Sequence, residues 1–135
     1  MREMDVVIGL VCRHNQVLIC QRRASDPLGG CWEFPGGKLE PGESREQCLA
    51  RELAEELAIH VQVIEPLDTI EYDYAAVRLR LHPYLCRHVE GEPVPLASQQ
   101  VTWATAADLQ KYVFPPANDA LLRWLGPRLE SAADL

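Results

Sequence analysis

The sequence has 135 residues, of which 47% are hydrophobic and 24% charged, and its formal net charge is −7. This length suits one domain with a core of its own, so we expect a single domain over residues 1–135. A protein that grips a long nucleic acid needs a basic stripe to displace phosphate counterions. The acidic balance, with no basic cluster beyond Arg22-Arg23, argues against polymeric DNA or RNA as the main partner. The acidic charge does not exclude small phosphorylated substrates, because a bound divalent cation can neutralise their negative charge.

The first apolar run, residues 6–12, is too short to cross a bilayer and lacks the features of a signal peptide. The five cysteines are odd in number and form no CxxC pair, so neither a disulfide framework nor a zinc knuckle is indicated. We therefore expect a cytoplasmic protein with reduced thiols and no membrane partner. The sequence is silent on oligomeric state beyond the expectation of a monomer or weak dimer.

The N-terminal half begins with two apolar, β-branched runs, residues 5–11 and 16–21, which predict a β-hairpin with its turn at 13–15. Residues 22–41 are rich in Gly and Pro and predict a loop with a short strand near 31–34. Ser44, with Gln47 as its capping-box partner, predicts the start of a helix that runs to about residue 57. The apolar stripe of this helix consists of Leu49, Leu53 and Leu57.

Beyond this helix, residues 61–64, 69–74 and 77–87 predict strands, and the last of them alternates apolar with polar residues. A turn at 91–95 and a short strand at 101–104 follow. A short helix begins at Thr105, and residues 118–125 form the final one. Strands dominate over helices, so the predicted class is mixed α/β or α+β.

The glutamates of the predicted helix at 44–57 carry the strongest functional signal. Glu52, Glu55 and Glu56 are spaced i, i+3, i+4, which puts their carboxylates on one helical face. Like charges at this spacing destabilise a helix by roughly 0.2–0.5 kcal/mol per pair. A hard cation such as Mg²⁺ relieves the repulsion, because it binds carboxylate oxygens together with substrate phosphates. The alternative is a solvated glutamate face, relieved in part by Arg51 paired with Glu55.

The loop before the helix favours the metal site. Gly36-Gly37 leads through Pro41-Gly42 into the helix, and glycines there let the backbone approach a ligand closely. Gly36 could therefore supply a carbonyl oxygen to the same cation. An ordinary hairpin turn is the alternative when Gly36-Gly37 is taken alone.

Together these residues resemble the Nudix box, which spans residues 37–59 here. The box reads Gly37, Glu43, Arg51, Glu52, Leu53, Glu55, Glu56, Ala58 and Ile59. Ala58 stands where the box has a late glycine, a change that removes no metal ligand. A match of this length and order is highly specific. Residues 21–24, 32–38, 91–93 and 114–118 extend the similarity to the MutT-like nucleoside triphosphate pyrophosphohydrolases.

The resemblance implies an α/β/α sandwich around a central mixed β-sheet and an enzyme that acts on phosphoric anhydride bonds. With Mg²⁺, or Mn²⁺, water would attack a phosphorus and release a nucleoside monophosphate and pyrophosphate. The favoured reading is sanitisation of the nucleotide pool by hydrolysis of 8-oxo-dGTP, a role in DNA replication and repair. The alternative within the same chemistry is a CTP or general (d)NTP pyrophosphohydrolase. A non-catalytic nucleotide-binding Nudix module is the alternative from another class, although such modules typically lose box glutamates.

The resemblance also assigns roles by position. Glu52, Glu55 and Glu56 would be the catalytic carboxylates and, with the Gly36 carbonyl, would hold the metal; Glu52 would orient or deprotonate the attacking water. An Arg51 to Glu43 contact would clamp the loop against the helix from outside the ligand set. The residues expected to contact substrate are Arg23 and Lys38 at the phosphates, and Phe34, Tyr74 and Asn118 at the base.

Each base contact has a simpler alternative. Asn118 could be a helix N-cap, and Phe34 and Tyr74 could be plain core aromatics. Two departures from the family pattern also bear on the site. Residues 97–100 hold no carboxylate where relatives often carry a further metal-binding glutamate, and Val77 stands where an arginine helps to read oxidised guanine, with Arg78 turned to the other face of the strand.

Overall fold

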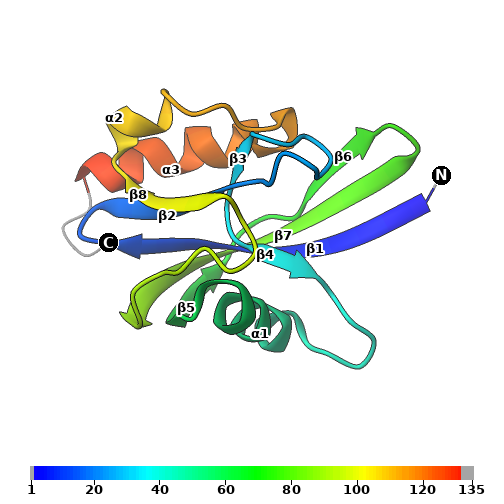
Figure 1. The fold of residues 1–135 in the computed structure, drawn as a ribbon, viewed down its shortest axis with the longest axis horizontal. Coiled ribbons are helices and arrows are strands. Elements are labelled where there is room, and N and C mark those ends of the chain that lie inside the picture. The colour runs from blue at the N-terminus through cyan, green and yellow to red at the C-terminus, as the bar shows by residue number, and fades with distance from the viewer. Residues whose placement is uncertain (1, 132–135) are drawn as a thin grey trace.

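The computed structural model describes residues 2–131, which form one eight-stranded sheet between two helical layers (Figure 1). The strands are β1 (Arg2–Arg13), β2 (Gln16–Gln21), β3 (Trp32–Glu33), β4 (Gly36–Lys38), β5 (His60–Pro66), β6 (Ile70–Tyr74), β7 (Val77–Glu90) and β8 (Gln100–Ala104). The helices are α1 (Arg45–Leu57), α2 (Ala106–Leu109), α3 (Asp119–Ser131) and the 3-10 helix η1 (Pro116–Asn118). In Figure 1, α1 covers one face of the sheet while α2 and α3 cover the other, which confirms the predicted sandwich with a central mixed sheet.

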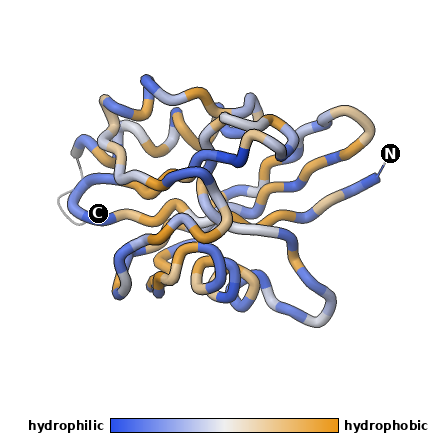
Figure 2. The backbone as a smooth tube through the Cα atoms, viewed as in Figure 1, coloured by the Kyte–Doolittle hydropathy of each residue, from blue (hydrophilic) through white to orange (hydrophobic). Residues whose placement is uncertain are grey.

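The long strands β1 and β7 run parallel at the centre of the sheet, from Arg2 opposite Val77 to Cys12 opposite Arg87. Strands β2, β3 and β8 extend the sheet beyond β1, and β5 and β6 pair antiparallel with β7. Side chains alternate across β1: Ile8 and Leu10 enter the core under α3, while Val7 and Val11 enter the core under α1. Figure 2 shows the resulting hydrophobic stretch along β1, as expected for a strand buried on both faces.

Most of the predicted elements are confirmed, with strands that run longer than expected. The hairpin turn has positive φ at His14 (50°) and Asn15 (61°), the left-handed pair that joins two twisted strands. Strand β4 was not predicted, because three residues of Gly-Gly-Lys carry no alternating pattern. It exists because the loop backbone pairs with β1, with Ile8 opposite Gly36 and Val6 opposite Lys38. Within residues 2–131, no helix is long and apolar enough to span a membrane.

Helix α1 begins at the predicted capping box. The Ser44 hydroxyl accepts from the Gln47 amide at 3.1 Å, and the Gln47 side chain accepts from the Ser44 amide at 2.9 Å. The predicted stripe of Leu49, Leu53 and Leu57 is buried against the sheet. Ala58 ends the helix in the left-handed region at φ 58°, a conformation that costs a non-glycine residue about 1–3 kcal/mol. The family's late glycine therefore matters for the helix exit, and its replacement leaves the glutamates one turn earlier in place.

A polar network joins β1 to β7 beside α1. The buried His82 donates from Nε2 to Asp5 Oδ1 at 2.8 Å, because an ionised carboxylate can only accept. Arg80 donates to both oxygens of Asp5, from Nε at 3.0 Å and from Nη2 at 3.2 Å. The hydrogen bonds from Arg80, followed by that from His82, lower the pKa of Asp5 from 3.8 to about 2. Since the Asp5 carbonyl also accepts from the Leu39 amide, the network lies directly behind the loop that precedes α1.

Asp5 should give the fold a measurable acid sensitivity. Its pKa is lower in the folded than in the unfolded chain, so its stabilising contribution is complete above about pH 4 and is lost as the pH falls towards 2. Asp5→Asn should lower the free energy of unfolding at pH 7 and flatten its decline between pH 4 and 2. Urea unfolding of both proteins at several pH values measures this. Equal slopes in the two proteins would contradict the prediction.

Candidate active site

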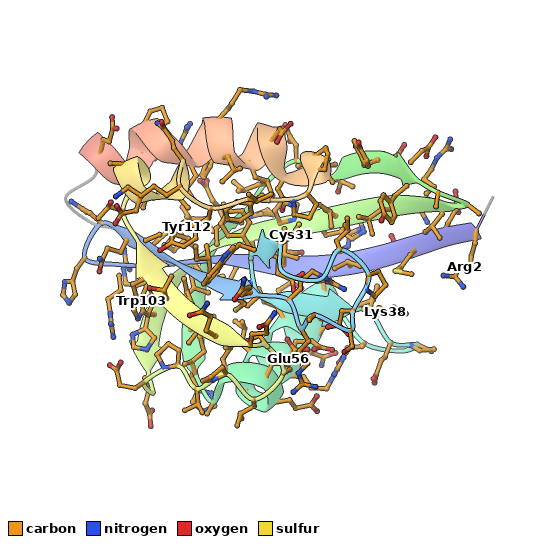
Figure 3. All side chains as sticks on the ribbon, turned by 45° about the horizontal axis from the view of Figure 1, so that its top comes forward. Arg2, Cys31, Lys38, Glu56, Trp103 and Tyr112 are labelled. Atoms are coloured by element: carbon orange, nitrogen blue, oxygen red, sulfur yellow. The ribbon has the colours of Figure 1, made fainter. Side chains whose placement is uncertain are left out.

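A cavity of about 620 Å³, a volume typical of small-molecule sites, is lined by residues of β1, β4, α1, β6, β7 and η1. One end is formed by β4 and α1, and the other by β6, β7 and η1. The first end is lined by Gly36, Gly37, Lys38 and Glu56, and the second by Phe34, Tyr72, Tyr74, Leu81 and Asn118. The cavity therefore connects the acidic helix to the predicted base-binding residues. Figure 3 labels Lys38 on β4 and Glu56 on α1 at the first end.

Arg51 connects the acidic face of α1 to the loop before it. Its Nε and Nη2 donate to the two carboxylate oxygens of Glu43 at 2.7 and 3.0 Å. Its Nη1 donates to Glu52 at 3.0 Å and to Glu55 at 3.3 Å. The hydrogen bond from Arg51 is the main cause that lowers the pKa of Glu43 to about 2, so this carboxylate stays ionised. The predicted Arg51 to Glu43 clamp is confirmed, and so is the pairing of Arg51 with Glu55.

Glu56 lines the acidic end of the cavity and hydrogen-bonds to Glu52, whereas Glu52 and Glu55 are not among the lining residues. Burial, followed by the hydrogen bond and the charge repulsion from Glu52, raises the pKa of Glu56 to about 8. At neutral pH the Glu56 carboxyl group therefore carries a proton, which it donates to Glu52. Gly37 packs directly against Glu52, since a Cβ added at Gly37 would collide with the Glu52 carboxyl group. Glu55 differs, because its side chain is 62% exposed and turned towards Arg51.

This donor set fits a hard divalent cation. Across residues 2–131, no three His, Cys, Asp or Glu side chains are arranged so as to hold a metal ion. The Glu52–Glu56 pair is nevertheless a crowded oxygen site in which a proton relieves the repulsion, and a cation would relieve it more fully. Gly36 also lines the cavity and precedes Gly37, the residue that packs against Glu52. Glu55 would join the set only by leaving Arg51.

The other end of the cavity is mainly apolar. Asn118, only 7% exposed, lines it and donates from Nδ2 to the Pro115 carbonyl at 3.3 Å. An N-cap would instead use its side-chain oxygen as an acceptor, so this contact does not support the simpler alternative. Phe34 is buried and packs on Phe114 at 5.4 Å, whereas Tyr74 is 42% exposed at the rim.

Strand alternation decides which residue of β7 faces the cavity. Val77 lines it, whereas Arg78 belongs to the other face and donates from Nε to Asp73 at 3.0 Å. The segment 97–100 likewise brings no carboxylate to the cavity. Ala97 and Ser98 line it, and the side-chain amide of Gln99 donates to the Arg22 carbonyl at 2.8 Å. Both departures noted in the sequence thus change the chemistry of the cavity wall.

The cavity wall also contains charged residues that the sequence did not single out. Arg22 and Glu33 both line it and form an ion pair at 2.8 Å. The neighbouring Arg23, expected at the phosphates, is not among the lining residues. Its guanidinium is exposed and donates to the Leu96 carbonyl at 3.0 Å. The end of β2 thus turns one arginine of the pair inwards and the other outwards.

The sequence profile of the NUDIX domain matches residues 6–124. The chain belongs to the Nudix family. This Nudix hydrolase is 33% identical over 123 residues to the 8-oxo-dGTP diphosphatase of Escherichia coli (strain K12), over 90% of this chain and 95% of that protein. It is also 33% identical over 122 residues to the CTP pyrophosphohydrolase of the same strain, over 90% of each. The solution structure of the E. coli ORF135 protein has a TM-score of 0.82 and 32% identity, over 99% of this chain and 96% of that one.

Gly37→Ala should lower the activity of this Nudix hydrolase without destabilising its fold. The backbone at Gly37 is not in the left-handed region, so alanine fits the strand, but its methyl group would displace the Glu52 carboxyl group. We expect hydrolysis to fall at least tenfold with little change in melting temperature. Gly126→Ala, where an added Cβ meets no atom within 4 Å, is the matched control. Full activity in Gly37→Ala would show that the position of Glu52 is not critical.

Proposed function

We propose that this Nudix hydrolase cleaves a nucleoside triphosphate to the monophosphate and pyrophosphate, with 8-oxo-dGTP as the favoured substrate. The observation that carries the proposal is the crowded Glu52–Glu56 pair at one end of a cavity whose other end holds the Asn118 amide. An acidic end suits the metal and phosphates, and an apolar end with one amide suits a base. A CTP or general (d)NTP pyrophosphohydrolase is the second candidate, since the CTP pyrophosphohydrolase and the 8-oxo-dGTP diphosphatase of Escherichia coli (strain K12) are each 33% identical to this chain.

The acidic end would bind Mg²⁺, or Mn²⁺, through Glu52, Glu55, Glu56 and the Gly36 carbonyl. When bound, the cation neutralises charge on the phosphate oxygens. Lys38, exposed at the cavity, would add a positive charge beside the phosphates. Retention of all these glutamates speaks against a non-catalytic binding module.

Glu52 would hold the attacking water and accept its proton. Arg51 donates to Oε1 of Glu52 and so fixes the position of the carboxylate. The water oxygen forms a bond to phosphorus, the bond to the bridging oxygen breaks, and pyrophosphate leaves with its electron pair. The protein would therefore have to position the water and neutralise charge on the phosphate oxygens, which are the main requirements of phosphoryl transfer.

Asn118 would read the base, because its amide can donate and accept together. Phe34 and Tyr74 would pack on the ring, and Val77 would add an apolar wall. The cellular role we propose is removal of damaged nucleotides from a cytoplasmic pool, in support of DNA replication and repair, by a single domain over residues 1–135 that acts as a monomer or weak dimer.

Pyrophosphate release tests the proposed reaction. The wild-type protein with Mg²⁺ is given 8-oxo-dGTP, dGTP, CTP and 5-methyl-dCTP, and 8-oxo-dGTP should have the highest kcat/KM. Chelation of the metal should abolish turnover, and Mn²⁺ should restore it. Glu52→Gln keeps the side-chain shape and should lower kcat at least 100-fold, because it cannot accept the proton. No turnover of any nucleotide by the wild type would overturn the proposed function.

Asn118→Ala tests the base contact separately from the reaction. Loss of the amide should change the ranking of the four nucleotides by about tenfold or more while each remains a substrate, since one buried hydrogen bond is worth about 1–3 kcal/mol. The ratio of kcat/KM values between 8-oxo-dGTP and CTP is the measurement. An unchanged ratio would mean that Asn118 only supports η1 through Pro115.

A further inference from the structure

Arg22 is fixed in the cavity wall by its own backbone. Its amide donates to the Cys31 carbonyl at 2.9 Å, and its carbonyl accepts from the Gly30 amide at 3.2 Å and the Gln99 side chain at 2.8 Å. These contacts hold the residue at the end of β2, next to the register in which Gln21 faces Trp32. The direction of the Arg22 side chain is therefore set by the sheet.

Two of the three guanidinium nitrogen atoms of Arg22 donate to protein acceptors. Its Nε donates to the Pro27 carbonyl at 2.7 Å, and its Nη1 donates to Glu33 Oε1 at 2.8 Å. Within residues 2–131, its Nη2 group donates to no protein acceptor, and the side chain is 28% exposed in a residue that lines the cavity. An arginine fork held on one edge by protein and open on the other is the arrangement that binds phosphate.

The Arg22–Glu33 pair lines the same cavity as Lys38 and Glu56 of the acidic end. Because Arg22 compensates Glu33, the pair does not add to the repulsion that a polyphosphate would meet there. The charged lining residues of the cavity are Arg2, Arg22, Asp26, Glu33, Lys38 and Glu56.

The adjacent Arg23 does not offer the same group. Its exposed guanidinium donates from Nη2 to the Leu96 carbonyl, and it lies outside the lining of the cavity. A substrate in the cavity would meet Arg22 first.

We propose that Arg22, held in place by Glu33, binds the phosphate chain of the nucleotide in the role that sequence resemblance gives to Arg23. The proposal rests on the proposed function for the identity of the substrate. Glu33 is a positioning residue, because it acts on the substrate through Arg22.

The experiment compares Arg22→Ala and Arg22→Lys with Arg23→Ala. KM for the best nucleoside triphosphate is measured, together with inhibition constants for the matching monophosphate and nucleoside. Arg22→Ala should raise KM and the monophosphate constant about 10–100-fold, the loss expected for a charge-assisted hydrogen bond, and leave the nucleoside constant within twofold. Arg22→Lys should recover part of the loss. Arg123→Ala, which removes the same charge from the exposed face of α3, should match the wild type.

Glu33→Gln tests the positioning role. It should raise KM less than Arg22→Ala does, and it should have no further effect when Arg22 is already alanine. Independent effects of the two changes would overturn the positioning role of Glu33.

Two results would overturn the assignment of Arg22. One is a loss of phosphate-dependent binding in Arg23→Ala that equals or exceeds that in Arg22→Ala. The other is an equal weakening of monophosphate and nucleoside in Arg22→Ala with a lower melting temperature, which indicates a purely structural role. If the wild type hydrolyses no nucleotide, the proposed function fails, whereas calorimetric binding of the monophosphate to wild type and Arg22→Ala still decides the role of Arg22.

Discussion

The guanidinium of Arg51 lies between the loop after β4 and the acidic face of α1, and it contacts carboxylates on both. Both oxygens of Glu43 accept from it, which closes the loop onto the helix, and Glu52 accepts on its other side. The closed loop brings Gly37 against the Glu52 carboxyl group, where no larger residue fits. The place of the acidic end of the cavity thus depends on one arginine, whose partners lie on two elements.

Arg51 relieves some glutamates and leaves another strained. Glu52 and Glu55 share its Nη1 group, whereas Glu56 is buried and repelled by Glu52, and it forms no ion pair with any residue within 2–131. The pKa of Glu56 rises because two carboxylates this close together are stable only when a cation or a proton lies between them. The repulsion predicted from the glutamate spacing therefore persists in the folded chain between Glu52 and Glu56, and Glu56 lines the cavity.

The sequence predicted what depends on local pattern. The α1 cap, its leucine stripe and the Arg51 to Glu43 contact follow from spacing along a helix or from the Nudix box. Strand β4 was missed because it owes its existence to pairing with β1. The choice between Arg22 and Arg23 was equally out of reach, because it depends on the register at which β2 ends against β3, and two adjacent arginines before a glycine-rich loop carry no such information. Glu33 gave no signal either, since nothing in the sequence marks it as a partner of Arg22.

Under the proposed function, the reaction would take place at the acidic end of the cavity, and the base would be recognised at the other end. The acidic end uses charges fixed by Arg51 and so suits any nucleoside triphosphate. At the other end, β7 turns Val77 inwards and pairs Arg78 with Asp73 on the opposite face, so this strand offers the base no charged donor. Apolar walls discriminate weakly, by about 1–3 kcal/mol per methylene, whereas a hydrogen-bonding group left unpaired discriminates far more. Under the proposed function, selectivity at this end would therefore depend on the Asn118 amide, and a base that satisfies both its donor and its acceptor would be favoured over one that satisfies a single group.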